Sequence, residues 1–294
     1  MQIVSIIGEG PSRLGVVRDR EVIDLGLAAP GVALDLVSVL KGAAGGLRGL
    51  AALAASAEPS AYRQIDSLRL GPPIPNPGKV ICLGLNYAEH AAEGGHAKPA
   101  YPAIFLRSAS SLIGHDAPII RPRCSEQLDY EGELVAIVGR TARHVTVGSA
   151  LDYVAGYSCF NDASIRDYQR KTPQWTIGKN FDGTGAFGPA FVSADEIPRG
   201  AAGLRIQTRL NGRVMQDANT AQMLFPVAET IALLTECMTL EPGDVIVMGT
   251  PSGVGHARKP PVWMKPGDAV EVEIEGIGLL RNRIAAEGVN DVTS

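Results

Sequence analysis

A proline-rich segment between residues 70 and 78 sets the strongest limit on how this 294-residue chain can fold. It contains four prolines in nine residues, and proline can neither continue a helix nor donate a hydrogen bond within a central strand. We therefore interpret residues 71–78 as a linker. It divides the sequence into a small N-terminal domain, residues 1–70, and a main domain, residues 79–294.

The N-terminal part combines short apolar strands with alanine-rich stretches. Strand patterns at 2–7, 14–18 and 21–24, the last two joined by a short polar turn, predict a β-meander. Residues 32–41 and 46–56 are rich in alanine and leucine and have glycines between them, which is typical of short helices. We expect a small α/β domain.

From residue 79 onwards the sequence is dominated by strand patterns. Few long helices separate the strands, so a doubly wound parallel sheet is disfavoured and a mixed, β-rich α+β fold is expected. The last predicted helix has one apolar face, because apolar residues recur from Val227 to Met238 at spacings of four, three and four. Strands are predicted near 80–84, 103–107, 130–138, 153–159, 204–210, 244–248, 269–275 and 277–284, and helices at 87–93, 162–170 and 225–238.

Composition argues against several classes of partner. The formal net charge is −4 and no long basic run occurs, which argues against nucleic acid. No apolar stretch is long enough to span a bilayer, and no basic segment precedes the first apolar run, so we expect a cytoplasmic protein without a signal peptide. The four cysteines are far apart in sequence and predict free thiols rather than a zinc site.

Two glutamates placed two residues apart, Glu131 and Glu133, predict a metal site. In a strand over 129–138 their side chains project from one face, roughly 6–7 Å apart. Like charges at this spacing repel each other unless a cation lies between them. Asp162, near the start of the next predicted helix, can add a third oxygen ligand, and the set suits Mg²⁺ or Mn²⁺. Taken alone, such a pair is more often part of a solvated edge strand.

His90 and Glu93 are three residues apart in a predicted helix and are therefore expected on one face. A hydrogen bond from the imidazole to the carboxylate would fix the tautomer of the ring and raise its basicity, which suits removal of a proton from water. On its own, such a pair is usually solvated. Residues 89–99 contain two glycines and end at a proline, and they are expected to form either a lid over bound substrate or an ordinary loop.

Arg166 and Gln169 follow Asp162 at spacings of four and three, so the predicted helix places all three side chains on one face. A metal ligand, a guanidinium and an amide that face one cleft suit the binding of a 2-oxo acid. Alternatively, Arg166 forms a surface ion pair along the helix, or pairs with Asp167 or Asp129.

Lys179 and the glycine-rich loop 249–255 complete the set of candidate residues. Beside a metal, the ammonium group of Lys179 would offset carboxylate charge and stabilise an enolate or oxyanion, with a Schiff base as the competing role. The loop lacks the lysine of a phosphate-binding loop, so we expect its backbone amides and the Thr250 hydroxyl to hold a substrate carboxylate. Three histidines have no comparable context: His115, His144 and His256.

Six sequence blocks in a fixed order resemble the fumarylacetoacetate hydrolase family over about residues 79–284. The resemblance implies a mixed β-sandwich roll, a Mg²⁺ or Mn²⁺ site, chemistry on small 2-oxo or 2,4-dioxo acids, and an electrostatic role for Lys179. It also places the family's histidine–glutamate pair at His90 and Glu93, and it implies a homodimer formed through the main domains. The blocks are GLNYAEHAAE at 84–93, DYEGEL at 129–134, ND at 161–162 with RD at 166–167, GKNFD at 178–182, PGD at 242–244 and GTPSG at 249–253.

The sequence therefore predicts a metal-dependent hydrolase that cleaves a carbon–carbon bond in a 2,4-dioxo acid of the acylpyruvate type. Glu131, Glu133 and Asp162 would hold the metal, and His90, oriented by Glu93, would activate water. Cleavage would expel a pyruvate-type enolate that the metal and the lysine stabilise. Isomerase and decarboxylase activities are alternatives on the same site. An alternative of another class is a non-catalytic binding protein with a structural cation such as Ca²⁺.

Overall fold

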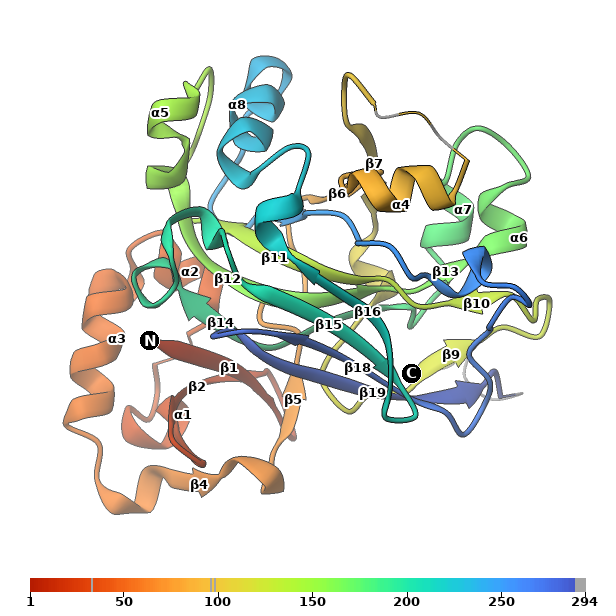
Figure 1. The fold of residues 1–294 in the computed structure, drawn as a ribbon. Helices are drawn as coiled ribbons and strands as arrows, with labels where there is room; N and C mark the ends of the chain where they lie inside the picture. Colours follow the sequence, from red (N-terminus) through yellow and green to blue (C-terminus); the bar gives the residue numbers. More distant parts are fainter. Residues whose placement is uncertain (33, 96, 98, 289–294) are drawn as a thin grey trace.

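The computed structural model describes residues 1–32, 34–95, 97 and 99–288. Two β-sheets packed face to face form the body of the molecule, and short helices lie around them (Figure 1). The predicted β-rich fold of mixed type is confirmed. Within the described residues, no helix has both the length and the apolar character needed to cross a membrane.

The larger sheet has twelve strands and runs through both parts of the sequence. These strands are β1 (Gln2–Ile7), β2 (Arg13–Arg18), β3 (Glu21–Asp24), β4 (Tyr62–Gln64), β5 (Arg69–Gly71), β6 (Val80–Gly84), β7 (Ala103–Arg107), β8 (Leu112–Ile113), β11 (Gly132–Val138), β12 (Val154–Asp162), β14 (Gly185–Ser193) and β17 (Val245–Val247). Their main order is β4-β3-β2-β1-β14-β12-β11-β17-β6-β7, while β5 pairs with β1 and β8 pairs with β14. The predicted β-meander is confirmed as β1 to β3.

The proline-rich segment connects β5 and β6, which belong to this same sheet, rather than two separate cores. Strand β1 pairs with β2 and β5, and it also pairs with β14 of the main part, where Gln2 lies opposite Val192. One apolar core contains residues from both parts, such as Leu50 and Val135. The two parts therefore share a sheet and a core. A domain boundary at residues 71–78 stays a prediction.

The smaller sheet covers one face of the larger one. It contains β9 (Ile119–Arg121), β15 (Arg205–Leu210), β16 (Arg213–Asn219), β18 (Ala269–Ile274) and β19 (Gly278–Ala286), in the order β16-β15-β18-β19-β9. Apolar side chains from one face of β11, such as Leu134, pack with Ile206 and Val272 of this sheet. Val135 and Ile137 on the other face of β11 belong to the second core. Both faces of β11 are therefore buried, as the apolar pattern of this strand predicts.

Eight α-helices lie within the described residues. Helices α5 and α8 pack against each other, as do α6 and α7 (Figure 1). The predicted apolar face of α8 is confirmed, because Val227, Ile231 and Leu234 are all buried. The helices are α1 (Leu25–Ala28), α2 (Leu36–Leu40), α3 (Gly46–Ala55), α4 (Ala88–Glu93), α5 (Val147–Ala150), α6 (Arg166–Gln169), α7 (Thr176–Lys179) and α8 (Val227–Cys237).

Two predicted elements near the site differ from the structure. The strand expected over 129–138 is divided into β10 (Leu128–Asp129), which pairs with β13 (Ser164–Ile165), and β11. Glu131 lies between them, and its backbone N–H donates to a side chain, Asn161 Oδ1. The helix expected over 162–170 begins only at Arg166. Asp162 is instead the last residue of β12, where the ladder with β14 continues to that position.

Candidate active site

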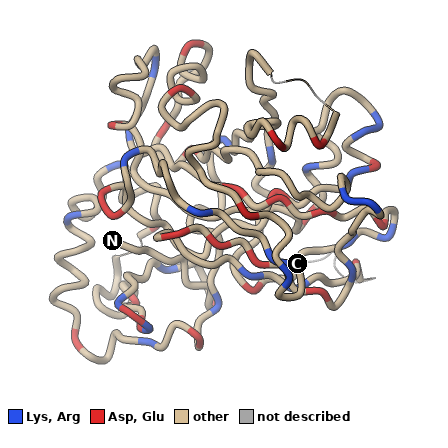
Figure 2. The backbone as a smooth tube through the Cα atoms, in the orientation of Figure 1, with Lys and Arg blue, Asp and Glu red and all other residues tan. Residues whose placement is uncertain are grey.

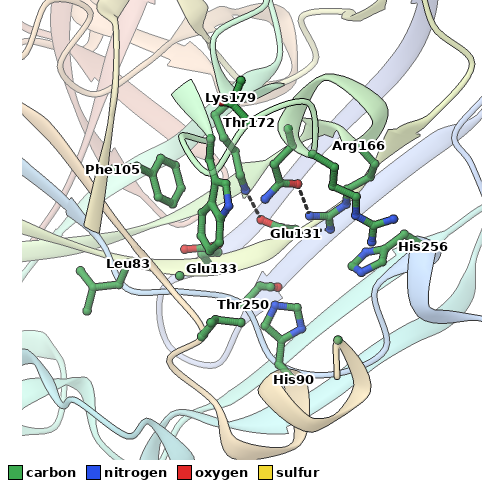
Figure 3. Close-up of a pocket in the computed structure, with 16 residues that line it drawn as sticks. Leu83, His90, Phe105, Glu131, Glu133, Arg166, Thr172, Lys179, Thr250 and His256 are labelled. Atoms are coloured by element: carbon green, nitrogen blue, oxygen red, sulfur yellow. Dashed lines mark hydrogen bonds and ion pairs between the residues drawn. The ribbon is translucent and has the colours of Figure 1, made fainter. Parts of the chain in front are cut away.

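A cavity of about 370 Å³ brings most of the predicted site residues together (Figure 3). Leu83, Phe105 and Trp175 form an apolar part of its wall. Two of the predicted residues, Glu93 and Asp162, do not line the cavity. Glu93 is hydrogen-bonded to His90 and Asp162 to Lys179, both of which do line it. The remaining predicted residues in the lining are His90, Glu131, Glu133, Arg166, Gln169, Lys179 and Thr250.

Three carboxylates come together at this cavity, two of them in its lining. One oxygen from each of Glu131, Glu133 and Asp162 lies within 4.8 Å of the others, and we call these residues the acidic group. Their proximity follows from strand register: Gly132 of β11 lies opposite Asn161 of β12, so the residues on either side of this pair come together. The main-chain N–H of Asp162 also donates to Glu131 O over 2.8 Å. Figure 2 shows acidic residues close together on the central strands.

Three buried cations contact the acidic group. Lys179 Nζ lies 2.5 Å from Glu131 Oε2 and 2.6 Å from Asp162 Oδ2. Arg166 Nη2 lies 2.6 Å from Glu131 Oε1, and Arg107 Nη1 donates to Asp162 Oδ1. Each of these cations is at most 4% exposed, so water screens the ion pairs weakly.

The charges at the acidic group are unevenly balanced. Burial is the largest single effect and raises the pKa of Glu131, but the neighbouring positive groups, Arg166 first and then Lys179, together outweigh it and leave this pKa well below the usual value. Burial, followed by the charges of Asp162 and then Glu131, raises the pKa of Glu133 well above the usual value. Glu133 is therefore the member that most lacks positive charge. A divalent cation held by the three carboxylates would supply it, and an all-oxygen donor set fits Mg²⁺ or Mn²⁺.

His90 and Glu93 form the hydrogen-bonded pair that their spacing predicts. Both lie on α4, and His90 Nδ1 is 2.8 Å from Glu93 Oε1. The other carboxylate oxygen, Oε2, accepts a hydrogen bond from the Gly253 N–H over 2.9 Å. With Nδ1 bound in this way, Nε2 is the ring nitrogen left for chemistry. We call His90 and Glu93 the histidine pair. The predicted lid over 89–99 includes residues 96 and 98, which lie outside the described residues, and the lid stays a prediction.

Arg166 and Gln169 are brought together, but not as the sequence suggested. Arg166 Nη1 donates to Gln169 Oε1 over 2.9 Å, and Arg166 Nε donates to Asp129 Oδ2 over 2.8 Å. The alternative pairing of Arg166 with Asp129 is therefore confirmed. Asp167 instead accepts a hydrogen bond from the Ser125 hydroxyl. The expected shared helix face with Asp162 is wrong, because that residue belongs to β12.

The backbone amides of residues 249–256 hold carboxylates of the protein itself. This differs from the expectation that they hold a substrate carboxylate. Gly249 has a φ of 89° and a Cβ there would approach Asn86 Cβ to 2.7 Å, so glycine is needed for this close approach. The N–H groups donate from Gly249 to Glu133 (2.5 Å), from Gly253 to Glu93 (2.9 Å), and from Gly255 to Asp129 (2.8 Å).

Thr250 lines the cavity, but its hydroxyl is already bonded within the protein. It donates to Gly132 O over 3.0 Å and accepts from Gln216 Nε2 over 2.7 Å. A hydroxyl has one hydrogen to donate, and Thr250 donates it to the first residue of β11 rather than offering a free donor to a ligand. Its predicted role in substrate binding stays a prediction.

Sequence reasoning missed two residues at the site, Arg107 and His256. Arg107 ends β7 and reaches Asp162, which is 55 positions away in sequence, so local spacing carries no signal of this contact. His256 lines the cavity and lies 3.2 Å from Asp129 Oδ2 through Nδ1. Its position directly after the glycine-rich loop was an available signal.

Comparisons with known proteins agree with this fold. Residues 79–285 match the family described as fumarylacetoacetate (FAA) hydrolase C-terminal. The chain is 42% identical over 213 residues to oxaloacetate tautomerase Fahd2a, mitochondrial, of Rattus norvegicus, which covers 72% of this chain and 68% of the relative.

Two solved structures extend the match to almost the whole chain. Fumarylacetoacetate hydrolase from Exiguobacterium antarcticum is 36% identical with a TM-score of 0.83, covering 98% of this chain and 100% of that one. Maleylpyruvate hydrolase from Sphingobium sp. SYK-6 is 28% identical with a TM-score of 0.79 and the same coverage. This chain therefore belongs to the fumarylacetoacetate hydrolase family of enzymes.

Proposed function

We propose that this protein transfers a proton at the carbon next to the 2-oxo group of a small 2-oxo acid, and thereby interconverts its keto and enol forms. The observation that carries the proposal is the placement of His90 in one cavity with the acidic group and Lys179 (Figure 3). Keto–enol conversion needs a base close to the carbon and positive charge close to the oxygen. His90 can supply the base, and Lys179 can supply the positive charge.

The acidic group is the part of the site that would hold Mg²⁺ or Mn²⁺. One oxygen from each of its members lies within 4.8 Å of the others, and among the described residues Glu133 forms no ion pair, since Lys179 pairs with Glu131 and Asp162. When bound, the ion supplies Lewis-acid polarisation of the 2-oxo group.

Lys179 and the apolar wall prepare the cavity for charge on the substrate oxygen. The ammonium group of Lys179 has three donors, and two of them are directed at Glu131 and Asp162. The third can donate to the 2-oxo oxygen as negative charge develops on it. Phe105 and Trp175 limit access of water from one side, which strengthens this interaction.

The histidine pair moves the proton. His90 Nε2 takes a hydrogen from the carbon next to the 2-oxo group and returns it in the reverse direction. Glu93 keeps the other ring nitrogen bonded and stabilises the imidazolium that forms, because its carboxylate lies 2.8 Å from Nδ1. The name of the rat relative, 42% identical, supports oxaloacetate as the first substrate to test.

The second candidate is the hydrolysis of a carbon–carbon bond in a 2,4-dioxo acid of the acylpyruvate type. The same histidine pair can orient a water molecule for attack on the distal carbonyl, and Lys179 can stabilise the leaving group. The match to two structures titled as hydrolases, over 98% of this chain, favours this alternative. A non-catalytic protein with a structural cation would need neither His90 nor Lys179 in the cavity.

One pair of assays separates these functions. The protein, with Mg²⁺ or Mn²⁺ added, should accelerate the loss of enol absorbance from oxaloacetate, and a chelator should remove the acceleration. Acetylpyruvate is tested in parallel, with pyruvate as the product that reports cleavage. Faster cleavage of acetylpyruvate than conversion of oxaloacetate would favour the hydrolase. No metal-dependent change with either acid would contradict both functions.

A further inference from the structure

A second histidine bonded to a carboxylate lies in the same cavity as the histidine pair. His256 Nδ1 is 3.2 Å from Asp129 Oδ2, and the His256 main-chain N–H donates to the same oxygen over 3.0 Å. The His256 side chain is 11% exposed and belongs to the cavity lining. Figure 3 shows His256 among the side chains that line the cavity.

Asp129 is fixed as a hydrogen-bond acceptor. It is fully buried, and three other groups donate to it: Arg166 Nε over 2.8 Å, the Gly255 N–H over 2.8 Å and the Tyr130 N–H over 2.9 Å. Because the carboxylate accepts from every other neighbour, the hydrogen between it and His256 belongs to Nδ1 of the ring. The Nε2 atom of neutral His256 then carries a lone pair that can accept a proton.

The two histidines are supported by one loop. The N–H of Gly253 holds Glu93, the partner of His90, while the N–H of Gly255 holds Asp129, the partner of His256. The two amides are only two residues apart, so this loop fixes both carboxylates relative to each other. His90 comes from α4 and His256 from the short 3-10 helix Gly255–Ala257 that follows the loop, so the rings reach the cavity from different elements.

We propose that His256 is a second proton-transfer residue, which exchanges a proton with the substrate oxygen while His90 exchanges one with carbon. This inference rests on the proposed keto–enol function. In the enol-to-keto direction, the enol O–H bond breaks and its proton passes to His256 Nε2. The oxygen electron pair forms the C=O bond, and the C=C electron pair takes a proton from the His90 imidazolium to form the new C–H bond. His256 gains one proton, His90 loses one, and exchange with water restores both.

The test compares His256→Asn and His256→Phe with the unchanged protein, each loaded with Mn²⁺. Both variants should lower kcat for oxaloacetate ketonisation by about 10²-fold, because a positioned acid–base group contributes this much. KM should stay within about threefold, and calorimetric binding of oxalate should be unchanged. Added imidazole should restore part of the activity of a His256→Ala variant. A residue with a purely structural role would show no such rescue.

His144→Asn is the matched control. His144 is exposed, lies outside the cavity and has a φ of 52°, a conformation that asparagine tolerates. It should retain full activity. If the unchanged protein converts oxaloacetate and both His256 variants do so at the same rate, the inference is wrong while the proposed function stands. If the unchanged protein converts neither acid, the proposed function is wrong, and the role of His256 with it.

Discussion

The acidic group and the histidine pair face the same cavity but are held in place in different ways. Glu131 and Asp162 each contact two buried cations, and Glu133 accepts a hydrogen bond from the Gly249 amide. The histidine pair lies on α4, a helix of six residues, and Glu93 is tied to the rest of the chain through the Gly253 amide. The first region is fixed by central strands and buried charge, and the second by a short helix.

This difference predicts that substitutions in the two regions affect different properties of the protein, namely stability in the first region and catalysis in the second. Among the described residues, four buried carboxylates at the site, counting Asp129, are accompanied by three buried cations: Arg107, Arg166 and Lys179. Removing one member of such a network leaves a buried charge uncompensated, which is strongly destabilising. Changes in the acidic group and its cations should therefore affect folding and metal binding. Changes in the histidine pair should affect the reaction alone.

The largest expected effect is on catalysis, from His90→Ala. We expect kcat to fall by roughly 10²–10⁴-fold, because the variant loses its acid–base group. The free energy of unfolding should change by no more than about 1 kcal/mol, because the hydrogen bond that the His90 side chain makes within the described residues joins it to Glu93 on its own short helix. Steady-state kinetics and urea unfolding measure the two quantities. A large loss of stability with normal kcat would contradict this prediction, because the histidine pair would then contribute to folding rather than to the reaction.

The largest effect on stability should come from Lys179→Met. Without added metal, the free energy of unfolding should fall by about 3–5 kcal/mol, because Glu131 and Asp162 lose a buried partner. Added Mg²⁺ should recover part of the loss, since the ion replaces positive charge. Urea unfolding with and without the ion measures both effects. Lys265→Met, at an exposed position, is the control. An equal loss of stability in this variant would show that the buried ion pairs of Lys179 are not the cause.

Glu93→Gln should lower kcat less than His90→Ala does, and it thereby separates the roles of the two members of the histidine pair. The variant keeps His90 but replaces the carboxylate that orients and stabilises its ring, so kcat should fall by about 10–100-fold, less than in His90→Ala. Both variants are measured with the same substrate at saturation. A loss in Glu93→Gln as large as that in His90→Ala would show that the carboxylate has a role of its own.

Metal-induced stabilisation should depend on pH through Glu133. Its pKa is raised by burial and by the charges of Asp162 and Glu131, so the metal-free folded state binds a proton more tightly than the unfolded state. The contribution of protonated Glu133 to stability is therefore lost as pH rises above its unfolded pKa. A metal ion needs the ionised form, so the rise in Tm caused by Mg²⁺ should grow between about pH 5 and about pH 8. A constant rise would contradict this role.

The oligomeric state is expected to have the smallest effect on the difference between the acidic group and the histidine pair. Following the family resemblance, we predict a homodimer formed mainly by residues after Lys79, with an interface above about 1,000 Å² that is apolar at its centre. Light scattering at micromolar concentration should give twice the 30.9 kDa mass of one chain. The mass of a single chain would contradict the dimer and leave the site unchanged, because both regions come from one chain.

Much of the site could be predicted because it depends on local spacing and on the six sequence blocks. The spacing of His90 and Glu93 along one helix was enough to predict their hydrogen bond. The convergence of Glu131 and Glu133 with Asp162 was also predicted, although the reason given for Asp162 was wrong. A helix and a strand end can place the same carboxylate at the same site, and spacing alone does not separate them.

The remaining features depend on contacts between distant segments. Arg107 ends β7, and the chain then continues into β8, where Leu112 lies opposite Gly185 of β14, which in turn lies opposite Asp162. Nothing in the sequence around Arg107 or Asp162 indicates this placement. The amides of residues 249–256 were predicted to bind an anion, which is what their glycines favour. That the anions are carboxylates of the protein itself depends on the folded positions of Glu133, Glu93 and Asp129.

The most direct test of the account is calorimetric titration of Mn²⁺ into the unchanged protein, Glu133→Gln and the exposed control Glu236→Gln. The acidic group predicts one ion per chain in the unchanged protein and in the control. It predicts binding weakened by about 10-fold or more in Glu133→Gln, with the fold retained by circular dichroism. Equal Mn²⁺ affinity in all three proteins, or no binding to the unchanged protein, would contradict the assignment of Glu131, Glu133 and Asp162 as the metal site.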